Sequence, residues 1–146
     1  MEGTRDEILK VWMKLSLAIN NERVVSGLPY NEFLICSILY WNQKKEKPLE
    51  LTATDLCNGT KILKSQMNRT LNSLEKKGLI ERTRSERDKR QVYVTFRMER
   101  AEIYEHEHER LLKFVDGVMD RVGWEHSEEI IKLFNLIANM AEEVLQ

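Results

Sequence analysis

The sequence has few of the residues that build long loops, all-β folds or membrane spans. Its 146 residues include only 6 glycines and 2 prolines, so long loops and an all-β fold are not expected. No apolar run approaches membrane-spanning length, and the acidic start MEGTRDEI is not a signal peptide. With 42% apolar and 32% charged residues, the composition indicates one soluble, helix-rich, cytoplasmic domain without membrane contact.

Cysteine is also scarce, and no catalytic pattern is present. Cys36 lies in an apolar run and is expected in the core, whereas Cys57 beside Asn58-Gly59 is expected to be more exposed. A cytosol would keep both reduced, and the sequence leaves open whether either senses redox state. Because there is no nucleophile–base pair, phosphate loop or nucleotide fingerprint, an enzyme is not expected.

Histidines offer little for a metal. His106 and His108 stand two residues apart in an expected helix, about 200° around its axis, so one ion cannot use both locally. Glu102 and His106 have the better i, i+4 spacing. We expect a solvated acidic helix face here, with no metal site and no other cofactor.

A net charge of −1 conceals an asymmetry along the chain. Residues 61–100 hold 12 basic and 5 acidic residues, a net of +7. The remainder holds 11 basic and 19 acidic residues, a net of −8. The positive segment can attract phosphate, while the negative remainder keeps DNA away from the other faces.

Apolar periodicity predicts six helices, over residues 5–26, 31–42, about 52–58, about 63–77, about 98–121 and from 127 onward. Thr52 and Asp55 have capping-box spacing, and Asn58-Gly59 is expected to end that short helix. Ser127 is the expected N-cap of the last helix. An apolar stripe follows it, made of Ile130, Phe134, Ile137, Ala141 and Val144.

The segment after the fourth helix predicts a winged helix. Gly78 is a natural left-handed helix stop, and residues 79–96 read LIERTRSERDKRQVYVTF. Val92, Val94 and Phe96 alternate with polar residues, as in a strand with one buried face. The fold class is therefore mostly α with a small β-hairpin wing, a winged helix-turn-helix flanked by N- and C-terminal helices.

The helix at 63–77 has two distinct faces. Leu63, Met67, Leu71 and Leu74 fall on one side, expected to be buried. Ser65, Arg69, Asn72 and Lys76 centre the opposite side, with Gln66 and Ser73 on one edge and Asn68 on the other. Such side chains can bond base edges and phosphates, although an ordinary solvated helix face has the same composition.

The predicted wing is dense in positive charge, with Arg82, Arg84, Arg87, Lys89 and Arg90 within nine residues. An arginine at a loop tip can enter a narrow minor groove. Asp88 cannot help a phosphate contact directly and is expected to hold the loop by pairing with an arginine. The plainer alternative is a hairpin tip charged only for solubility.

The run LKSQMNRTLNSLEKKGLIERTRSERDKRQVYVTF resembles the MarR family of bacterial winged-helix regulators. The match is dense over residues 52–97 and includes the LEKKGLIER junction and the Asp88-Lys89-Arg90 wing signature. The resemblance implies a homodimeric, ligand-responsive transcriptional regulator, expected to be a repressor on a pseudo-palindromic double-stranded DNA operator. It divides the chain of 1–146 into a DNA-binding lobe at 30–97 and dimerisation helices in 1–28 and 98–146.

By position, the resemblance implies that Ser65, Gln66, Asn68 and Arg69 enter the major groove and Arg90 the minor groove, with Asp88 bracing the wing. The further DNA-binding candidates are Asn72, Lys76, Arg84, Arg87 and Lys89. A small aromatic or anionic effector is implied in a crevice for which Trp12, Tyr40 and Trp41 are the candidate lining, the alternative being core and dimer packing. The rival function is a winged-helix protein–protein interaction module without DNA binding. Operator, effector and direction of regulation are left open.

Overall fold

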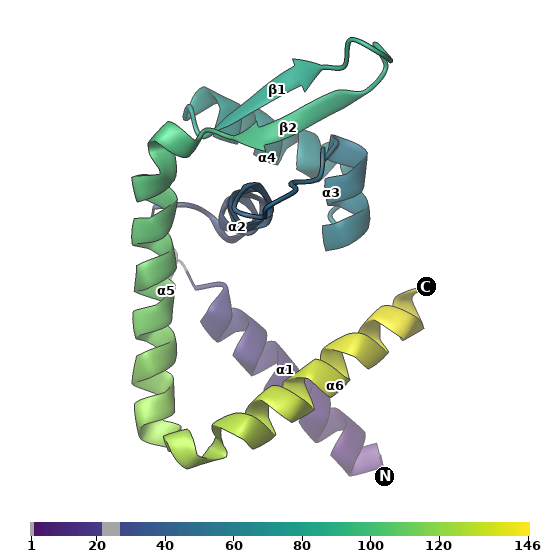
Figure 1. Cartoon of the computed structure of the whole chain (residues 1–146). Coiled ribbons are helices and arrows are strands. Elements are labelled where there is room, and N and C mark those ends of the chain that lie inside the picture. Colours follow the sequence, from purple (N-terminus) through teal and green to yellow (C-terminus); the bar gives the residue numbers. More distant parts are fainter. Residues whose placement is uncertain (1, 22–26) are drawn as a thin grey trace. The chain divides into compact units, whose positions relative to one another are not determined.

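The computed structural model describes residues 2–21 and 27–146. The first helix ends at Ile19, so the prediction of a helix over 5–26 is wrong at residues 20–21, and its part at 22–26 lies outside the described residues. The described elements are α1 (Glu2–Ile19), α2 (Tyr30–Gln43), α3 (Ala53–Thr60), α4 (Lys64–Lys76), β1 (Ile80–Arg84), β2 (Val92–Phe96), the 3-10 turn η1 (Met98–Arg100), α5 (Ala101–Val122), the 3-10 turn η2 (Trp124–His126) and α6 (Ser127–Leu145) (Figure 1). The predicted fold class, mostly helical with one two-stranded hairpin, is confirmed. No helix among the described residues is both long and apolar enough to cross a membrane. The chain divides into two units, 1–110 and 111–146.

The core of the first unit is built around α2. Ile35 and Cys36 are fully buried, as the nearly continuous apolar run of this helix predicted. From α4, the core takes Met67, Leu71 and Leu74, all with no exposed surface. The expectation for Leu63 is wrong, because this residue precedes α4 as its N-cap and is 72% exposed.

Two turns fix the ends of α3. The predicted capping box is confirmed, since Thr52 Oγ1 accepts from the Asp55 amide at 3.1 Å and Asp55 Oδ2 accepts from the Thr52 amide at 2.9 Å. The predicted end at Asn58-Gly59 is wrong. The helix continues to Thr60 and stops at Lys61, which has a φ of +63° and donates its amide to Cys57 O at 2.8 Å.

Gly78 joins α4 to the hairpin through a left-handed turn. Its φ is +76°, its amide donates to Glu75 O, and the Leu79 amide donates to Leu74 O, each at 3.0 Å. This pair of bonds is the Schellman motif, which a residue with a Cβ adopts only under strain. The chain therefore enters β1 three residues after Lys77, the C-cap of α4, so that α4 and the hairpin stay in contact.

The hairpin is antiparallel, with Ile80 opposite Phe96 and Arg84 opposite Val92. Val94 and Phe96 are buried on its inner face, as the alternation predicted. The Val94 amide donates to Leu51 O at 2.8 Å, which ties the hairpin to the residues just before α3.

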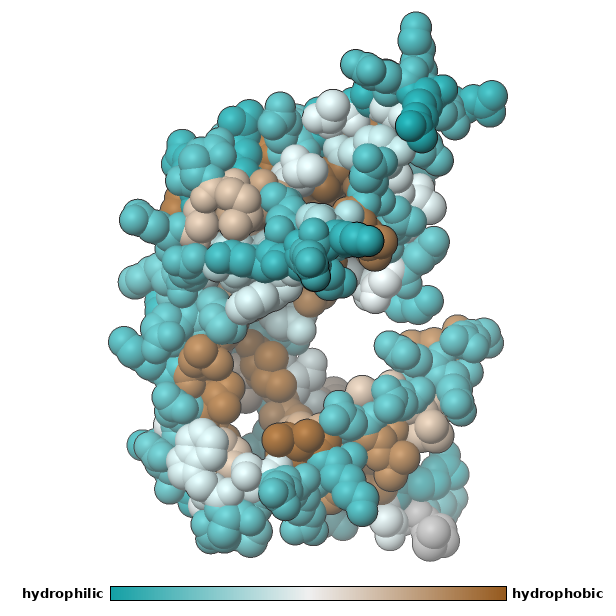
Figure 2. All heavy atoms as spheres, viewed as in Figure 1, coloured by the Kyte–Doolittle hydropathy of each residue, from teal (hydrophilic) through white to brown (hydrophobic). Residues whose placement is uncertain are grey.

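The second unit, 111–146, contains the end of α5, η2 and α6. Gly123, with a φ of +108°, separates the two helices as predicted. Ser127 is not the N-cap of α6. It is the first helical residue, because η2 leads directly into the helix and His126 occupies the cap. No α6 residue is buried within the chain, and hydrophobic side chains lie open on its surface (Figure 2).

Candidate nucleic-acid interface

The polar face of α4 is presented to solvent, apart from Ser73 on its edge, which is partly buried. All six of the residues predicted on it for DNA contact are exposed: Ser65, Gln66, Asn68, Arg69, Asn72 and Lys76. The opposite face holds Met67, Leu71 and Leu74 in the core, so the packing fixes the rotation of the helix about its axis. A helix oriented in this way offers donors and acceptors in a row along one side.

Arg82 of β1 connects the hairpin to this helix. Its guanidinium makes two bonds to the Glu75 carboxylate, Nε to Oε2 at 3.2 Å and Nη2 to Oε1 at 3.0 Å. Nη2 also donates to Asn72 Oδ1 at 2.6 Å. The hydrogen bond from Arg82 lowers the pKa of Glu75 below its ordinary value, and the same bond raises the pKa of Arg82. Arg82 was predicted only as part of the charged wing, and nothing in the local sequence pattern indicates its contacts with Asn72 and Glu75 of α4.

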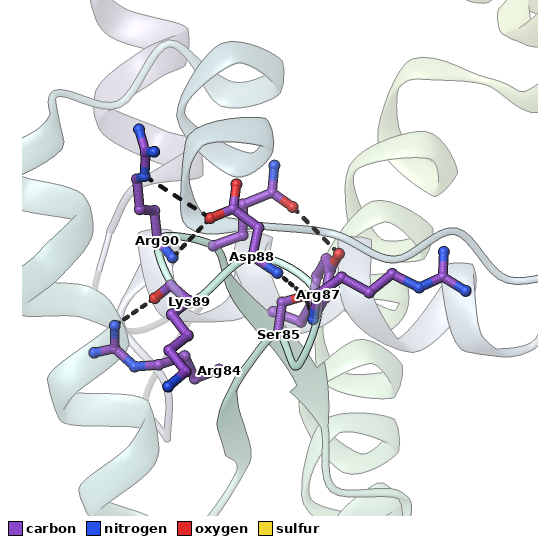
Figure 3. Close-up of polar contacts among 8 residues, drawn as sticks. Arg84, Ser85, Arg87, Asp88, Lys89 and Arg90 are labelled. Atoms are coloured by element: carbon purple, nitrogen blue, oxygen red, sulfur yellow. Dashed lines mark hydrogen bonds and ion pairs between the residues drawn. The ribbon is translucent and has the colours of Figure 1, made fainter.

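The loop between the strands has a defined internal structure (Figure 3). Ser85, which is only 8% exposed, accepts at Oγ from the amides of Arg87 and Asp88, both at 3.2 Å. Asp88 Oδ1 accepts from the Arg90 amide at 3.0 Å and lies 4.0 Å from Arg90 Nε. The main contact of Asp88 is thus with backbone, and the pairing with the guanidinium is at the distance limit of an ion pair.

Ser85 is a loop residue that sequence reasoning did not single out. A serine that opens a loop and bonds amides two and three residues later is a known turn element, and the Ser85–Asp88 spacing was the available signal. Across the loop, the Arg84 guanidinium donates to Lys89 O, and the Gln91 amide donates to Asp88 O at 2.9 Å. These bonds give the wing a fixed backbone on which the cations are mounted.

The cations themselves face solvent. The Arg90 side chain is 96% exposed, and Arg87 and Lys89 are exposed beside it. Arg84 is exposed as well, although its guanidinium is partly engaged by Lys89 O. The tip appears in Figure 2 as a hydrophilic projection from the body of the first unit. Exposed guanidinium groups of this kind can form charge-assisted hydrogen bonds with phosphates, and the ion pair of Arg90 with Asp88 is at the distance limit.

The three aromatics predicted to line a ligand pocket have different surroundings. Tyr40 is buried, and its hydroxyl donates to Glu105 Oε1 at 2.6 Å, a bond that raises the pKa of the phenol because it favours the protonated form. Trp41 packs edge-on against Tyr40 with ring centroids 5.1 Å apart, and it is half exposed. Trp12 instead lines a hollow with residues of its own helix, Thr4, Glu7, Ile8 and Val11.

Neither cysteine nor histidine forms a recognisable centre. Cys36 is fully buried, and burial raises the pKa of its thiol to about 12, while Cys57 is partly exposed. His108 contacts the rings of Trp41 and Tyr104 at centroid distances of 6.1 and 5.8 Å. Within residues 2–21 and 27–146, no three of the His, Cys, Asp and Glu side chains are grouped to hold a metal ion.

This winged-helix arrangement matches a known family in sequence and solved structures in fold. Residues 26–91, which span α2, the helix-turn-helix, β1 and the loop of the wing, match the sequence model of the MarR family. The winged helix of this chain is of the MarR family. No curated protein sequence matches the chain. In the MarR winged helix described here, α3 and α4 form the helix-turn-helix, and β1 and β2 form the wing.

Solved structures share the MarR fold over nearly the whole length. The transcriptional regulator BldR from Sulfolobus solfataricus is 23% identical, with a TM-score of 0.70 over 94% of both chains. The transcriptional repressor CouR, solved on a 23-mer DNA duplex, is 19% identical with a TM-score of 0.79 over 94% of this chain and 97% of CouR. FabT from Streptococcus pneumoniae, solved in complex with DNA, is 19% identical with a TM-score of 0.69 over 99% of both chains.

Proposed function

We propose that this protein is a transcriptional regulator that binds a specific double-stranded DNA operator, acts as a repressor and has no enzymatic activity. One observation carries the proposal. The exposed polar face of α4 lies on the winged helix whose ordered loop carries Arg84, Arg87, Lys89 and Arg90. Two structures of the same fold, CouR and FabT, were solved with DNA bound, which supports a DNA partner.

In the proposed complex, α4 enters the major groove, which is wide enough for a helix. Ser65, Gln66, Asn68 and Arg69, at its N-terminal end, contact base edges there. Lys76, at the opposite end, contacts a phosphate, since an ammonium group at the edge of the groove meets the backbone first. Asn72 lies between them and completes the contact row.

The wing follows the neighbouring minor groove. Arg90 is the residue that enters it, because its side chain is almost completely exposed and its backbone is held by Asp88. Arg84, Arg87 and Lys89 contact the flanking phosphates. A preformed loop loses less conformational entropy on binding than a flexible one, so the bonds of Ser85 and Asp88 contribute to affinity without contacting DNA.

We further propose that the protein acts as a homodimer through the regions 1–28 and 98–146, with 30–97 as the DNA-binding lobe. The exposed apolar side chains of α6 support this, among them Phe134 at 54% and Ile137 at 43%. Monomeric soluble proteins rarely expose so continuous a stripe, and a second copy can cover it. Two lobes related by a two-fold axis require a pseudo-palindromic operator, with half-sites about 10 bp apart.

An effector completes the proposal. A small aromatic or anionic molecule binds beside Tyr40 and Trp41, where the half-exposed indole offers a ring face, with Trp12 as the contribution of α1. Such a molecule alters DNA affinity only if it favours one spacing of the two recognition helices over another.

A fragment selection tests this function. The purified protein is mixed with sheared genomic DNA in the presence of excess non-specific competitor, and the retained fragments are sequenced. The expected result is a small set of fragments that share an inverted repeat. Retention without any common sequence, or no retention at low salt, would overturn the proposal and leave the protein-interaction module as the remaining reading.

A further inference from the structure

The bond between Arg82 and Asn72 determines which atoms of Asn72 are available to a ligand. We infer that Arg82 is a positioning residue that fixes the side-chain amide of Asn72, so that Asn72 presents two N–H donors to DNA. The inference rests on the proposed function, since it concerns how the same helix face recognises its operator. It assigns a role to Arg82 and Glu75, which need not contact DNA themselves.

The polarity of the Asn72 amide follows from chemistry. An arginine guanidinium has only donors, so the group 2.6 Å from Arg82 Nη2 must be an acceptor. Of the two terminal atoms of asparagine, only Oδ1 accepts. A flipped amide would place N–H groups of both residues against each other, which is repulsive. The Nδ2 group of the exposed Asn72 is therefore the part left for an external partner.

Glu75 holds Arg82 in this position. The carboxylate receives two bonds from the guanidinium, and it lies on α4 three residues after Asn72, so both partners of Arg82 belong to one helix. The side chain of Arg82 is only 26% exposed, which limits its freedom to turn toward DNA. The hydrogen bond from Arg82 lowers the pKa of Glu75, so its carboxylate stays anionic to a lower pH than an ordinary glutamate.

The consequence is a restriction on what Asn72 can recognise. Bidentate recognition of adenine by asparagine uses Oδ1 and Nδ2 together. Here Oδ1 already has a charged partner, so this mode is disfavoured, and Nδ2 donates to an acceptor instead. The acceptor is either a base atom in the major groove, such as guanine O6 or N7 or thymine O4, or a phosphate oxygen. These two sources differ in whether the contact depends on sequence.

The test uses two variants that change the net charge in opposite directions, Arg82→Gln and Glu75→Gln. The probe is the duplex recovered by the wild-type protein from a random-sequence pool, together with every single-base change in one half-site. Both variants free the Asn72 amide, so both are expected to lose discrimination at the same position, by roughly tenfold for a base contact. Asn72→Ala is expected to lose the same discrimination. With a phosphate contact, all three variants weaken every duplex equally.

A double variant separates positioning from direct contact. If Arg82 acts through Asn72, then Arg82→Gln in the Asn72→Ala background weakens binding by no more than about twofold beyond Asn72→Ala alone. Lys45→Gln is the charge control, since it removes one positive charge from an exposed side chain outside α4 and the hairpin. Thermal unfolding verifies that each variant is folded, and Glu75→Gln preserves the shape of an exposed side chain if Arg82→Gln does not fold.

Three results would overturn the inference. They are full additivity of the two substitutions, unchanged binding by Asn72→Ala, or loss of discrimination in Arg82→Gln but not in Glu75→Gln. Each of these leaves the proposed function intact, because the wild-type protein still selects an operator. A wild-type protein that selects no common sequence overturns the proposed function and this inference together.

Discussion

Lys77 Nζ lies 2.6 Å from Glu32 Oε1, and this contact joins the end of α4 to the first turn of α2. The Glu32 side chain is only 10% exposed, and its second contact is Ser73 Oγ at 3.3 Å. A carboxylate this deeply placed needs its partners, because an unpaired buried charge is costly. The pair therefore fixes the inclination of α4 on the core, and with it the direction in which the polar face points.

Replacement of Lys77 tests this contact. Lys77→Met should lower the free energy of unfolding by about 1–3 kcal/mol, because Glu32 loses its charged partner while it remains buried. Lys76→Met is the matched control, because Lys76 is solvent-exposed, and this variant should change stability by less than about 0.5 kcal/mol. Urea denaturation of both variants measures the difference. Equal stabilities would mean that the pair does not hold α4.

The wing is tested by Arg90→Ala. Operator binding should weaken by roughly 1–3 kcal/mol without loss of stability, since the side chain is mounted on a solvated loop. Asp88→Ala and Ser85→Ala should weaken binding less, through a looser loop backbone. Fluorescence anisotropy with a labelled operator gives the affinities. If none of the three folded variants differs from wild type, the wing is not a DNA-binding element.

The two faces of α4 predict opposite phenotypes. Arg69→Ala should reduce operator affinity by about 1–3 kcal/mol and leave stability unchanged. Met67→Ala should instead cost about 2–5 kcal/mol of stability, because Met67 is fully buried and its truncation leaves a cavity. Affinity and unfolding are measured on both proteins. A flattened preference at one position assigns Arg69 to a base, whereas uniform loss assigns it to a phosphate. Equal stability of the two variants would contradict the assigned faces.

Removal of residues 127–146 tests the dimer. Loss of α6 should yield a monomer in sedimentation equilibrium, because no residue of this helix is buried within the chain and its apolar stripe needs a partner. Operator affinity should then fall by roughly 10²–10⁴, the contribution of two linked half-site contacts. A truncated protein that still sediments as a dimer would refute pairing through α6.

The two cysteines should differ in reactivity. The pKa of Cys36 is raised to about 12 by burial, and the thiolate is the reactive form. At pH 8, a thiol reagent should therefore modify Cys57 quickly and Cys36 only as fast as the chain unfolds. Because the pKa of Cys36 is higher in the folded chain, the protonated thiol contributes to the free energy of unfolding. This contribution is complete below pH 9.0, the ordinary pKa, and is lost as the pH rises toward 12. Rapid modification of both thiols in the native protein would contradict the buried position.

Much of this architecture could be predicted because the determining signals are local. The capping box at Thr52, the left-handed glycine at 78 and the alternation in β2 each report on a few neighbouring residues. The errors also have local causes. Leu63 matches the apolar period of α4 yet stands before its first turn, and Ser127 is preceded by a 3-10 turn that supplies the helix start.

The contacts that sequence could not predict join distant residues. Glu32 and Lys77 are 45 positions apart, and nothing in either local pattern indicates the other. The same holds for Arg82, which reads as one of five wing cations but packs against Asn72 and Glu75. In both cases the packing of α2, α4 and β1 around one core decides which charges meet, and that packing is a property of the whole fold.

A salt titration of operator binding tests the central claim most directly. The affinity for the selected duplex is measured from about 50 to 200 mM monovalent salt. Neutralisation of several phosphates by α4 and the wing predicts a linear fall of log affinity with log salt, with a total loss of roughly 10³-fold or more. An affinity that barely changes over this range, or no duplex binding at the lowest salt, would contradict the account of this protein as a DNA-binding regulator.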